Sequence, residues 1–264
     1  MGTAVREVID FLTNPAIDME NTVDHLLFGD PESIVRGIAT TFVATQEAID
    51  QAMLLGVNLL VSHEGFFFSH RGKREVFQDD PVYRQKLQMI ENSHIAIFRN
   101  HDHVHRQTPD IVTEGLLVSL GWREFEVDRR QAWSVLEVPA MTVREILTHI
   151  QRSLDLAHLR YIGNEAMPCR RLGVLVGYRG TGELATPLFE KEGLDAVIYG
   201  EGPEWEAPEY VRDAVYQGRQ KALVVLGHAE SEMPGMSRLA ARLQKSFPDI
   251  PVHFIPQKPV FQLS

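Results

Sequence analysis

The sequence predicts an α/β protein made of two α/β domains, each with a mostly parallel sheet flanked by helices. Short apolar segments rich in β-branched residues alternate with amphipathic segments along most of the 264 residues. Hydrophobic residues make up 44% of the chain, which is sufficient for a full core. The alternation restarts after Trp122, so we expect a first domain over residues 1–125 and a second over 126–264.

The first half follows a strand–helix rhythm. We expect strands within 21–31 and at 38–43, 58–62 and 94–99, and helices at 5–12, 46–55, 82–92 and 108–120. Thr45 has the side chain of a helix N-cap, and Thr108 followed by Pro109 has the pattern of a second one. Helices between strands are typical of βαβ units, which place parallel strands side by side.

The second half repeats this rhythm. We expect strands at 133–138, 172–176, 194–199, 222–226 and 251–255, and helices at 142–154, 183–192, 208–216 and 235–247. A glycine-rich turn, Gly177 to Gly182, follows one strand and opens a helix. Such a turn can bind a phosphate with its backbone N–H groups, but it lacks the residues of a P-loop, which favours a plain tight turn.

Charge and composition narrow the class of protein. The net charge of −10 argues against nonspecific binding to nucleic acid or to an anionic membrane surface. The chain has one cysteine, Cys169, so it can form neither an intramolecular disulfide nor a thiolate cluster. No segment has the length of a membrane span and the first 19 residues lack a signal-peptide apolar run, so we expect a cytoplasmic protein.

Histidines and carboxylates follow three of the predicted strands. His63 and Glu64 end the first of these strands, and His101, His103 and His105 follow the second. The third strand precedes a Gly-His-x-x-x-Glu segment, whose histidine and final glutamate are His228 and Glu232. Strand ends present side chains rigidly in α/β proteins, and imidazole with carboxylate binds divalent metals. We therefore expect the three strand ends to form one metal site.

Each cluster also has a simpler interpretation. His63 and Glu64 alone are typical of a helix cap with a surface polar group. His101, His103 and His105 point to one side if the backbone is extended, and such a face is either solvated or ligated. If a helix begins early, His228 and Glu232 lie one turn apart on one face; otherwise they belong to a loop or a helix N-terminus.

Taken together, these segments resemble the Nif-three-like family of dinuclear metal-centre proteins, also known as GTP cyclohydrolase I type 2 homologues. The resemblance runs through residues 21–31, 43–45, 59–68, 101–105, 200–201 and 227–235 in order. It implies two α/β domains, a homohexameric ring and two divalent ions in a cleft, to which residues 226–264 return. Zinc, iron and manganese suit such a ligand set.

The family pattern has two adjacent histidines, then His-Thr-Asn-x-Asp, then Gly-His-x-x-x-Glu. Laid on this sequence, its ligand positions are His63, Glu64, His105, His228 and Glu232. Glu64 replaces a histidine and His105 replaces an aspartate, so the total of three imidazoles and two carboxylates is unchanged. One hypothesis is that the exchange preserves a two-metal site. The opposing hypothesis is that one ion is lost.

A two-metal site can activate water for hydrolysis of a nucleotide or a phosphoester. In that function His101 or His103 shuttles protons, because unperturbed imidazole titrates near pH ~6.5. The ligand is then a small nucleotide-like or phosphorylated molecule. The alternatives are a non-enzymatic metal chaperone and a regulatory, ring-forming scaffold.

Overall fold

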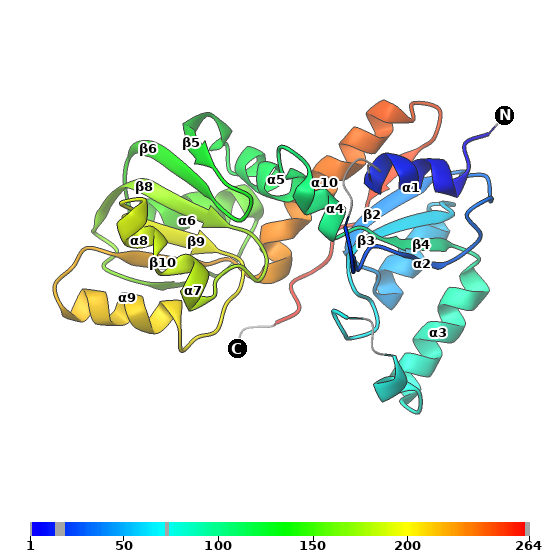
Figure 1. Cartoon of the computed structure of the whole chain (residues 1–264), viewed down its shortest axis with the longest axis horizontal. Helices are drawn as coiled ribbons and strands as arrows, with labels where there is room; N and C mark the ends of the chain where they lie inside the picture. Colours follow the sequence, from blue (N-terminus) through cyan, green and yellow to red (C-terminus); the bar gives the residue numbers. More distant parts are fainter. Residues whose placement is uncertain (1, 14–18, 72–73, 262–264) are drawn as a thin grey trace. The chain divides into compact units, whose positions relative to one another are not determined.

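A computed structural model describes residues 2–13, 19–71 and 74–261 (Figure 1). The chain divides into two compact units. The first contains residues 1–111 and 236–264, and the second contains residues 112–235. Each unit has a mixed β-sheet flanked by helices, which confirms the predicted fold class. No helix in the described residues is long and apolar enough to cross a membrane.

The sheet of the first unit has the strand order β1-β4-β3-β2-β11 among the described residues. Its strands are β1 (Leu26–Phe28), β2 (Ile38–Val43), β3 (Leu59–Glu64), β4 (Ala96–Arg99) and β11 (Val252–Phe254). β1 is antiparallel to β4, and the other neighbours are parallel. The central strands β2, β3 and β4 are almost entirely buried, as expected for parallel strands covered on both faces.

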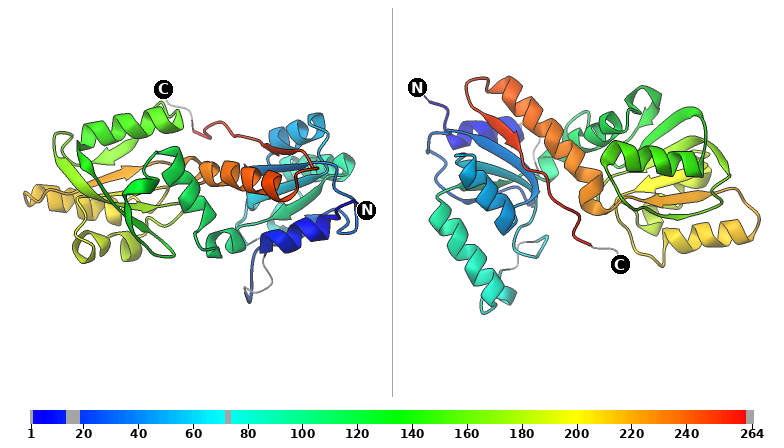
Figure 2. Two further views of the ribbon diagram at one scale, coloured as in Figure 1. Left: turned by 90° about the horizontal axis from the view of Figure 1, so that it is seen from above. Right: turned by 180° about the vertical axis from the view of Figure 1, so that it is seen from behind.

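Helices cover both faces of this sheet. They are α1 (Val5–Thr13), α2 (Gln46–Leu54), α3 (Pro81–Ser93) and the short α4 (Asp102–Arg106), with a 3₁₀ turn at Glu75–Phe77. In Figure 2, α1 lies on one face while α2 and α3 lie on the other. Ile49 of α2 and Ile90 of α3 belong to one core cluster with Leu60 of β3 and Ile97 of β4. Thr45 caps α2 as predicted, its side chain accepting from the Ala48 N–H.

The sheet of the second unit has the order β5-β6-β8-β9-β10-β7 among the described residues. Its strands are β5 (Glu126–Arg129), β6 (Ser134–Thr142), β7 (Arg160–Ile162), β8 (Pro168–Leu175), β9 (Ala196–Tyr199) and β10 (Ala222–Val225). The pairs β8–β9 and β9–β10 are parallel, and the remaining pairs are antiparallel. The sequence does not predict β5 and β7, which are only four and three residues long and have no buried residue.

The helices of the second unit are α5 (Ile111–Ser119), α6 (Val143–Leu154), α7 (Gly182–Ala185), α8 (Leu188–Lys191) and α9 (Ala207–Tyr216), with a 3₁₀ turn at Arg123–Phe125. Thr142 and Glu145 form a capping box at the start of α6. The single helix predicted at 183–192 is two short helices, because Pro187 has no N–H to continue the first one. α5 begins at Ile111, so the prediction that Thr108 caps it is wrong.

The last long helix, α10 (His228–Ser246), begins in the second unit and ends in the first. It begins seven residues before the predicted start at 235 and contains Pro234, a residue that normally ends a helix. The chain then forms β11, which pairs in parallel with β2. The predicted strand near 251–255 is therefore confirmed.

Candidate metal centre

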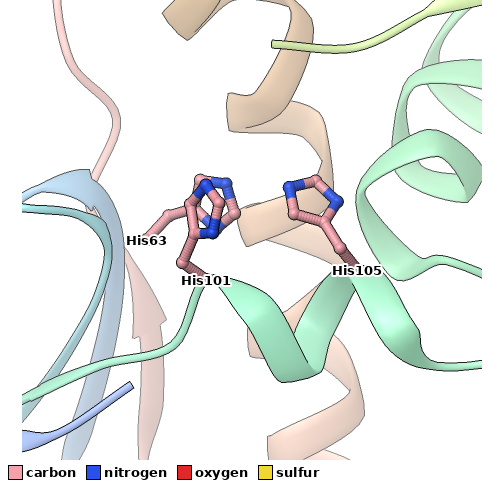
Figure 3. Close-up of side chains that lie close together, drawn as sticks. All are labelled: His63, His101 and His105. Carbon is pink, nitrogen blue, oxygen red and sulfur yellow. The ribbon is translucent and has the colours of Figure 1, made fainter. Parts of the chain in front are cut away.

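Three histidines of the first unit lie together beside the carboxyl ends of β3 and β4 (Figure 3). His63 belongs to β3, His101 directly precedes α4, and His105 is on α4. The ring centroids are 4.8 Å apart for His63 and His101, 5.0 Å for His63 and His105, and 5.1 Å for His101 and His105. One ring nitrogen of each lies within 4.8 Å of the other two. The three side chains are therefore close enough to share one ion.

The short helix α4 places two histidines in this cluster, His101 directly before the helix and His105 within it. Asp24 holds the start of the helix, because its carboxylate accepts the backbone N–H groups of His101, Asp102 and His103 at 2.7 to 2.9 Å. Spacing of four residues puts His101 and His105 on one face of a helix. His103 turns away and lies 2.7 Å from Asp24 through Nδ1. The extended backbone considered from the sequence, with all three rings on one side, is wrong.

Each histidine of the cluster has its Nδ1 beside an oxygen that can only accept a hydrogen bond. The pairs are His63 with the Asn100 carbonyl at 3.1 Å, His101 with Asp102 at 2.9 Å, and His105 with Asp110 at 3.1 Å. For His63 and His105 the proton of a neutral ring therefore sits on Nδ1 and the lone pair on Nε2, whereas His101 has a second carboxylate, Glu64, 3.3 Å from its Nε2. Histidines that bind metals through Nε2 are oriented in this way by carboxylates and carbonyls.

Asp102 is itself fixed by neighbouring groups. Its Oδ2 accepts the Thr22 hydroxyl at 3.0 Å and the Val23 N–H at 2.9 Å. The hydrogen bond from His101, helped by these two bonds, holds the pKa of Asp102 well below its usual range although partial burial opposes this. Asp102 is thus an ionised acceptor that orients the His101 ring.

Glu64 lies at the edge of the histidine cluster and has several partners. Its Oε1 is 3.3 Å from His101 Nε2. Its Oε2 accepts from Arg99 at 2.9 Å and from the Gly65 N–H at 3.2 Å, and lies 3.4 Å from His70 Nδ1. Arg99 is buried and also donates to the carbonyl oxygens of His70 and His63. One oxygen of Glu64 therefore faces the cluster while the other binds a guanidinium.

The pKa of Glu64 reflects these neighbours. Burial raises the pKa of this carboxyl, but the hydrogen bond and charge of His101, with the charges of His63 and Arg99, lower it well below its usual range. Burial lowers the pKa of Arg99, and the charge of Glu64 raises it. The pair therefore carries one charge of each sign.

The second unit has a separate histidine–carboxylate pair at the start of α10. His228 Nε2 lies 3.2 Å from the buried Glu232, one helical turn away, as the early helix start predicted. Its Nδ1 lies 2.9 Å from Glu201. The Ser231 hydroxyl donates to the His228 carbonyl and accepts the Gly177 N–H. The pair thus offers one imidazole and one carboxylate as ligands.

The glycine-rich turn of the second unit uses its own N–H groups. The Gly177 N–H is bonded to Ser231, the Gly180 N–H to the Glu201 carbonyl, and the Gly182 N–H to Glu206. These three donors are directed to the protein, so the turn has the arrangement of a plain tight turn. The phosphate-binding alternative has no support from these contacts.

Sequence reasoning found the chemistry of the first unit but not all of its participants. His101, predicted as a proton carrier, lies with His63 and His105, while His103 lies against Asp24. The sequence does not indicate roles for Asp24, Asp110 and Arg99, because the partners of these charged residues are defined only by the fold. The signal available for Asp110 was its position five residues after His105.

The three imidazoles of the first unit fit a divalent metal ion. Each is oriented through Nδ1, and the ligand atoms lie together in a largely buried position. Three histidines are the ligand set of some catalytic zinc sites, in which water takes the remaining position. Iron and manganese also accept imidazole when carboxylate is nearby. Glu64 supplies such a carboxylate 3.3 Å from His101.

Comparison with known proteins agrees with this architecture. The chain is 22% identical over 256 residues to a protein of Clostridium acetobutylicum named "GTP cyclohydrolase 1 type 2 homolog", covering 92% of this chain and 91% of that protein. It is 26% identical over 240 residues to a Clostridium perfringens protein with the same name, covering 88% and 87%. A crystal structure of a Staphylococcus aureus hypothetical protein matches with a TM-score of 0.78, at 16% identity and with 100% of both chains covered.

A family model describes the chain almost from end to end. The Duf34/NIF3 (NGG1p interacting factor 3) model matches residues 3–259, which include both units and every histidine discussed above. The protein is therefore a member of the Duf34/NIF3 family.

Proposed function

We propose that this protein binds a divalent metal ion through Nε2 of His63, His101 and His105 and uses it for hydrolysis. One observation carries the proposal: all three rings are already oriented by an oxygen at Nδ1, and they converge within one cluster. Carboxylate or carbonyl partners at Nδ1 are the arrangement that metal-binding histidines adopt.

The bound ion would supply Lewis acidity and a water molecule whose pKa is near neutrality. The protein's own groups orient this site. Asp102 and Asp110 keep the protons of their histidines on Nδ1, and Glu64 presents an ionised carboxylate beside His101. A carboxylate with a strongly lowered pKa is a weak general base, which leaves Glu64 the role of orienting a water or a ligand. His103 remains the predicted proton carrier, and we assign His101 to the metal.

A two-ion site is the second candidate. The family resemblance implies it, because its five ligand positions include Glu64, His228 and Glu232 in addition to His63 and His105. In that form Glu64 also acts as a ligand, as the family pattern implies. The two candidates differ in the number of ions per chain, which elemental analysis counts directly.

The decisive experiment is metal content per chain, measured on protein purified without chelator or nickel resin. We expect at least one ion of zinc, iron or manganese, lost in His105→Ala. The matched control is His103→Ala, which removes a buried histidine from the same helix but outside the cluster. Its metal content should equal that of the unmodified protein. Equal metal content in all three proteins would exclude the three-histidine site.

Hydrolysis is tested on the metal-loaded protein with a panel of nucleotides and phosphoesters. GTP heads the panel because the two clostridial relatives carry its name. Turnover that is absent from His105→Ala and retained in His103→Ala would support a hydrolase in which His103 is dispensable. Turnover lost in both would place His103 in proton transfer. Transfer of the ion to a chelating apo-protein without turnover would instead support a metal chaperone.

We also propose that the chain assembles into the homohexamer that the family resemblance implies. Light scattering coupled to size exclusion measures the mass directly, and a value of six chains is expected. A monomeric mass at micromolar concentration would exclude both the ring and the scaffold function that depends on it.

A further inference from the structure

Arg99 is a buried cation placed between two groups that could themselves bind a metal. Its side chain is 4% exposed. Its Nη2 lies 2.9 Å from Glu64 Oε2 and 3.1 Å from His70 Nδ1. Nη1 donates to the His70 carbonyl, and Nε lies 3.4 Å from the His63 carbonyl. The guanidinium thus connects β4 to the end of β3 and to the loop that follows it.

Without the guanidinium, the surrounding side chains form a second ligand set. Glu64, His70 and His101 each offer one atom within 4.8 Å of the other two. The His70 side chain is 54% exposed, so solvent reaches this position. This set shares His101 with the three-histidine cluster, and a ring nitrogen binds a single ion, so a second ion beside a metal-bound His101 would have Glu64, His70 and water as its ligands.

A metal ion and the guanidinium would compete for the same atoms. Arg99 already contacts the Glu64 oxygen and the His70 nitrogen on one side of this set. A dication bound there would lie only a few ångströms from a positive charge in a poorly solvated position, where repulsion is strong. Two backbone carbonyls also hold Arg99 in place, because they accept from its Nη1 and Nε.

We propose that Arg99 is a built-in cation that occupies a second cation site, so that the first unit binds one metal ion instead of two. The inference deepens the proposed metal-binding function and rests on it for the ion at the three histidines. A carboxylate is the partner that a buried guanidinium requires, whereas a neutral histidine would leave the charge uncompensated.

The test is a gain of metal. Apo-protein is loaded with excess Mn²⁺ or Zn²⁺, desalted, and analysed for ions per chain. Arg99→Gln removes the charge while keeping a donor for the His70 carbonyl, and we expect it to hold one ion more than the unmodified protein. The double variant Arg99→Gln/Glu64→Gln should return to the original count, because the carboxylate ligand is gone. Arg99→Lys, which keeps the positive charge, should also keep the original count.

The matched control is Arg84→Gln, which removes an exposed arginine of the same unit that pairs with Asp79. Its ion count should not change. A second readout is thermal: added metal should raise the Tm of Arg99→Gln by several degrees more than that of the unmodified protein, because an ion then compensates Glu64. An unchanged count in a folded Arg99→Gln protein overturns the proposal, and so does an extra ion in Arg99→Lys.

A variant of His70, whose ring contacts Arg99, covers the case in which Arg99→Gln does not fold. His70→Ala changes a largely exposed side chain. If Arg99 fills the second site, His70 holds no metal and the ion count of His70→Ala stays the same. Loss of an ion in His70→Ala overturns the proposal. Failure of the proposed function looks different, because there the unmodified protein binds no ion that depends on His105.

Discussion

The two units both carry histidines beside carboxylates, but these clusters differ in the number of metal ligands and in how firmly the ligands are oriented. In the first unit, three imidazoles converge, and each is oriented by a carbonyl or a carboxylate. In the second unit, one imidazole and one carboxylate are presented by adjacent turns of α10, and Glu201, which orients His228, is about half exposed. The first cluster has enough ligands to hold an ion by itself, whereas the second has two. Ligand number and orientation, more than the mere presence of histidine, distinguish the two clusters.

The largest expected effect is on zinc affinity, measured after one histidine is removed from either cluster. Isothermal titration of apo-protein with zinc should show that His63→Ala weakens the tightest binding event by more than about 100-fold, since one of three ligands is lost. His228→Ala should leave that event nearly unchanged, because His228 is not one of the three clustered histidines. If His228→Ala weakens it as much as His63→Ala does, the ion depends on both clusters and the comparison fails.

The next effect tests the groups that orient the rings. Asp110→Asn replaces an obligatory acceptor beside His105 with an amide, and we expect zinc affinity to fall about 10- to 100-fold. The corresponding change in the second unit is Glu201→Gln beside His228, for which we expect little change in the same event. Both variants keep the size of the side chain, so circular dichroism should show unchanged folds. Equal losses of zinc affinity would mean that the orienting carboxylates of both clusters contribute equally to this binding event.

A third prediction concerns the loop next to the first cluster. Lys86 is buried, contacts the Phe66 carbonyl, and lies over the rings of Phe66, Phe67 and Phe68. Burial lowers the pKa of Lys86 to about 8, below the ordinary value of 10.5. Between these values the unfolded chain binds more protons than the folded one, so this group makes stability rise with pH.

The measurement is urea unfolding of apo-protein at pH 8 and pH 10, compared with Lys86→Met. The free energy of unfolding of the unmodified protein should increase relative to the variant by about 1 to 3 kcal/mol over this range. Contacts with the phenylalanine rings favour the charged lysine and reduce the size of the effect. A parallel pH dependence in the two proteins would show that Lys86 titrates normally. The contacts of Lys86 with residues 66–68 would then make no pH-dependent contribution to the free energy of unfolding over this range.

The smallest predicted effect compares helix caps in the two units. Thr142→Ala removes a capping box that makes reciprocal bonds with Glu145, and should cost about 1 kcal/mol of stability. Thr45→Ala removes a single side-chain cap and should cost somewhat less. Added zinc should raise the Tm of Thr45→Ala more than that of Thr142→Ala if the ion stabilises the first unit only. Equal shifts would mean that both units unfold together.

The sequence predicted the strand ends well, because buried parallel strands are short apolar runs that stop at polar residues. His63, at the end of β3, is an example. It did not predict α4, a five-residue helix whose start depends on Asp24 from a segment 77 residues earlier along the chain. Nor did it predict the pairing of Glu64 with Arg99, 35 residues apart. Local patterns specify elements, whereas ring orientation and charge pairing depend on contacts that form only in the folded sheet.

The pairing of β11 with β2 has a consequence for how the chain is made. β2 is an internal strand only when residues 252–254 are present, since they satisfy its outer backbone groups. During synthesis these residues leave the ribosome only after the whole of the second unit. Until then β2 is an exposed apolar edge, of the kind that pairs with other chains. A chain truncated after α10 should therefore aggregate instead of forming a smaller folded product, because β2 then keeps an unpaired edge.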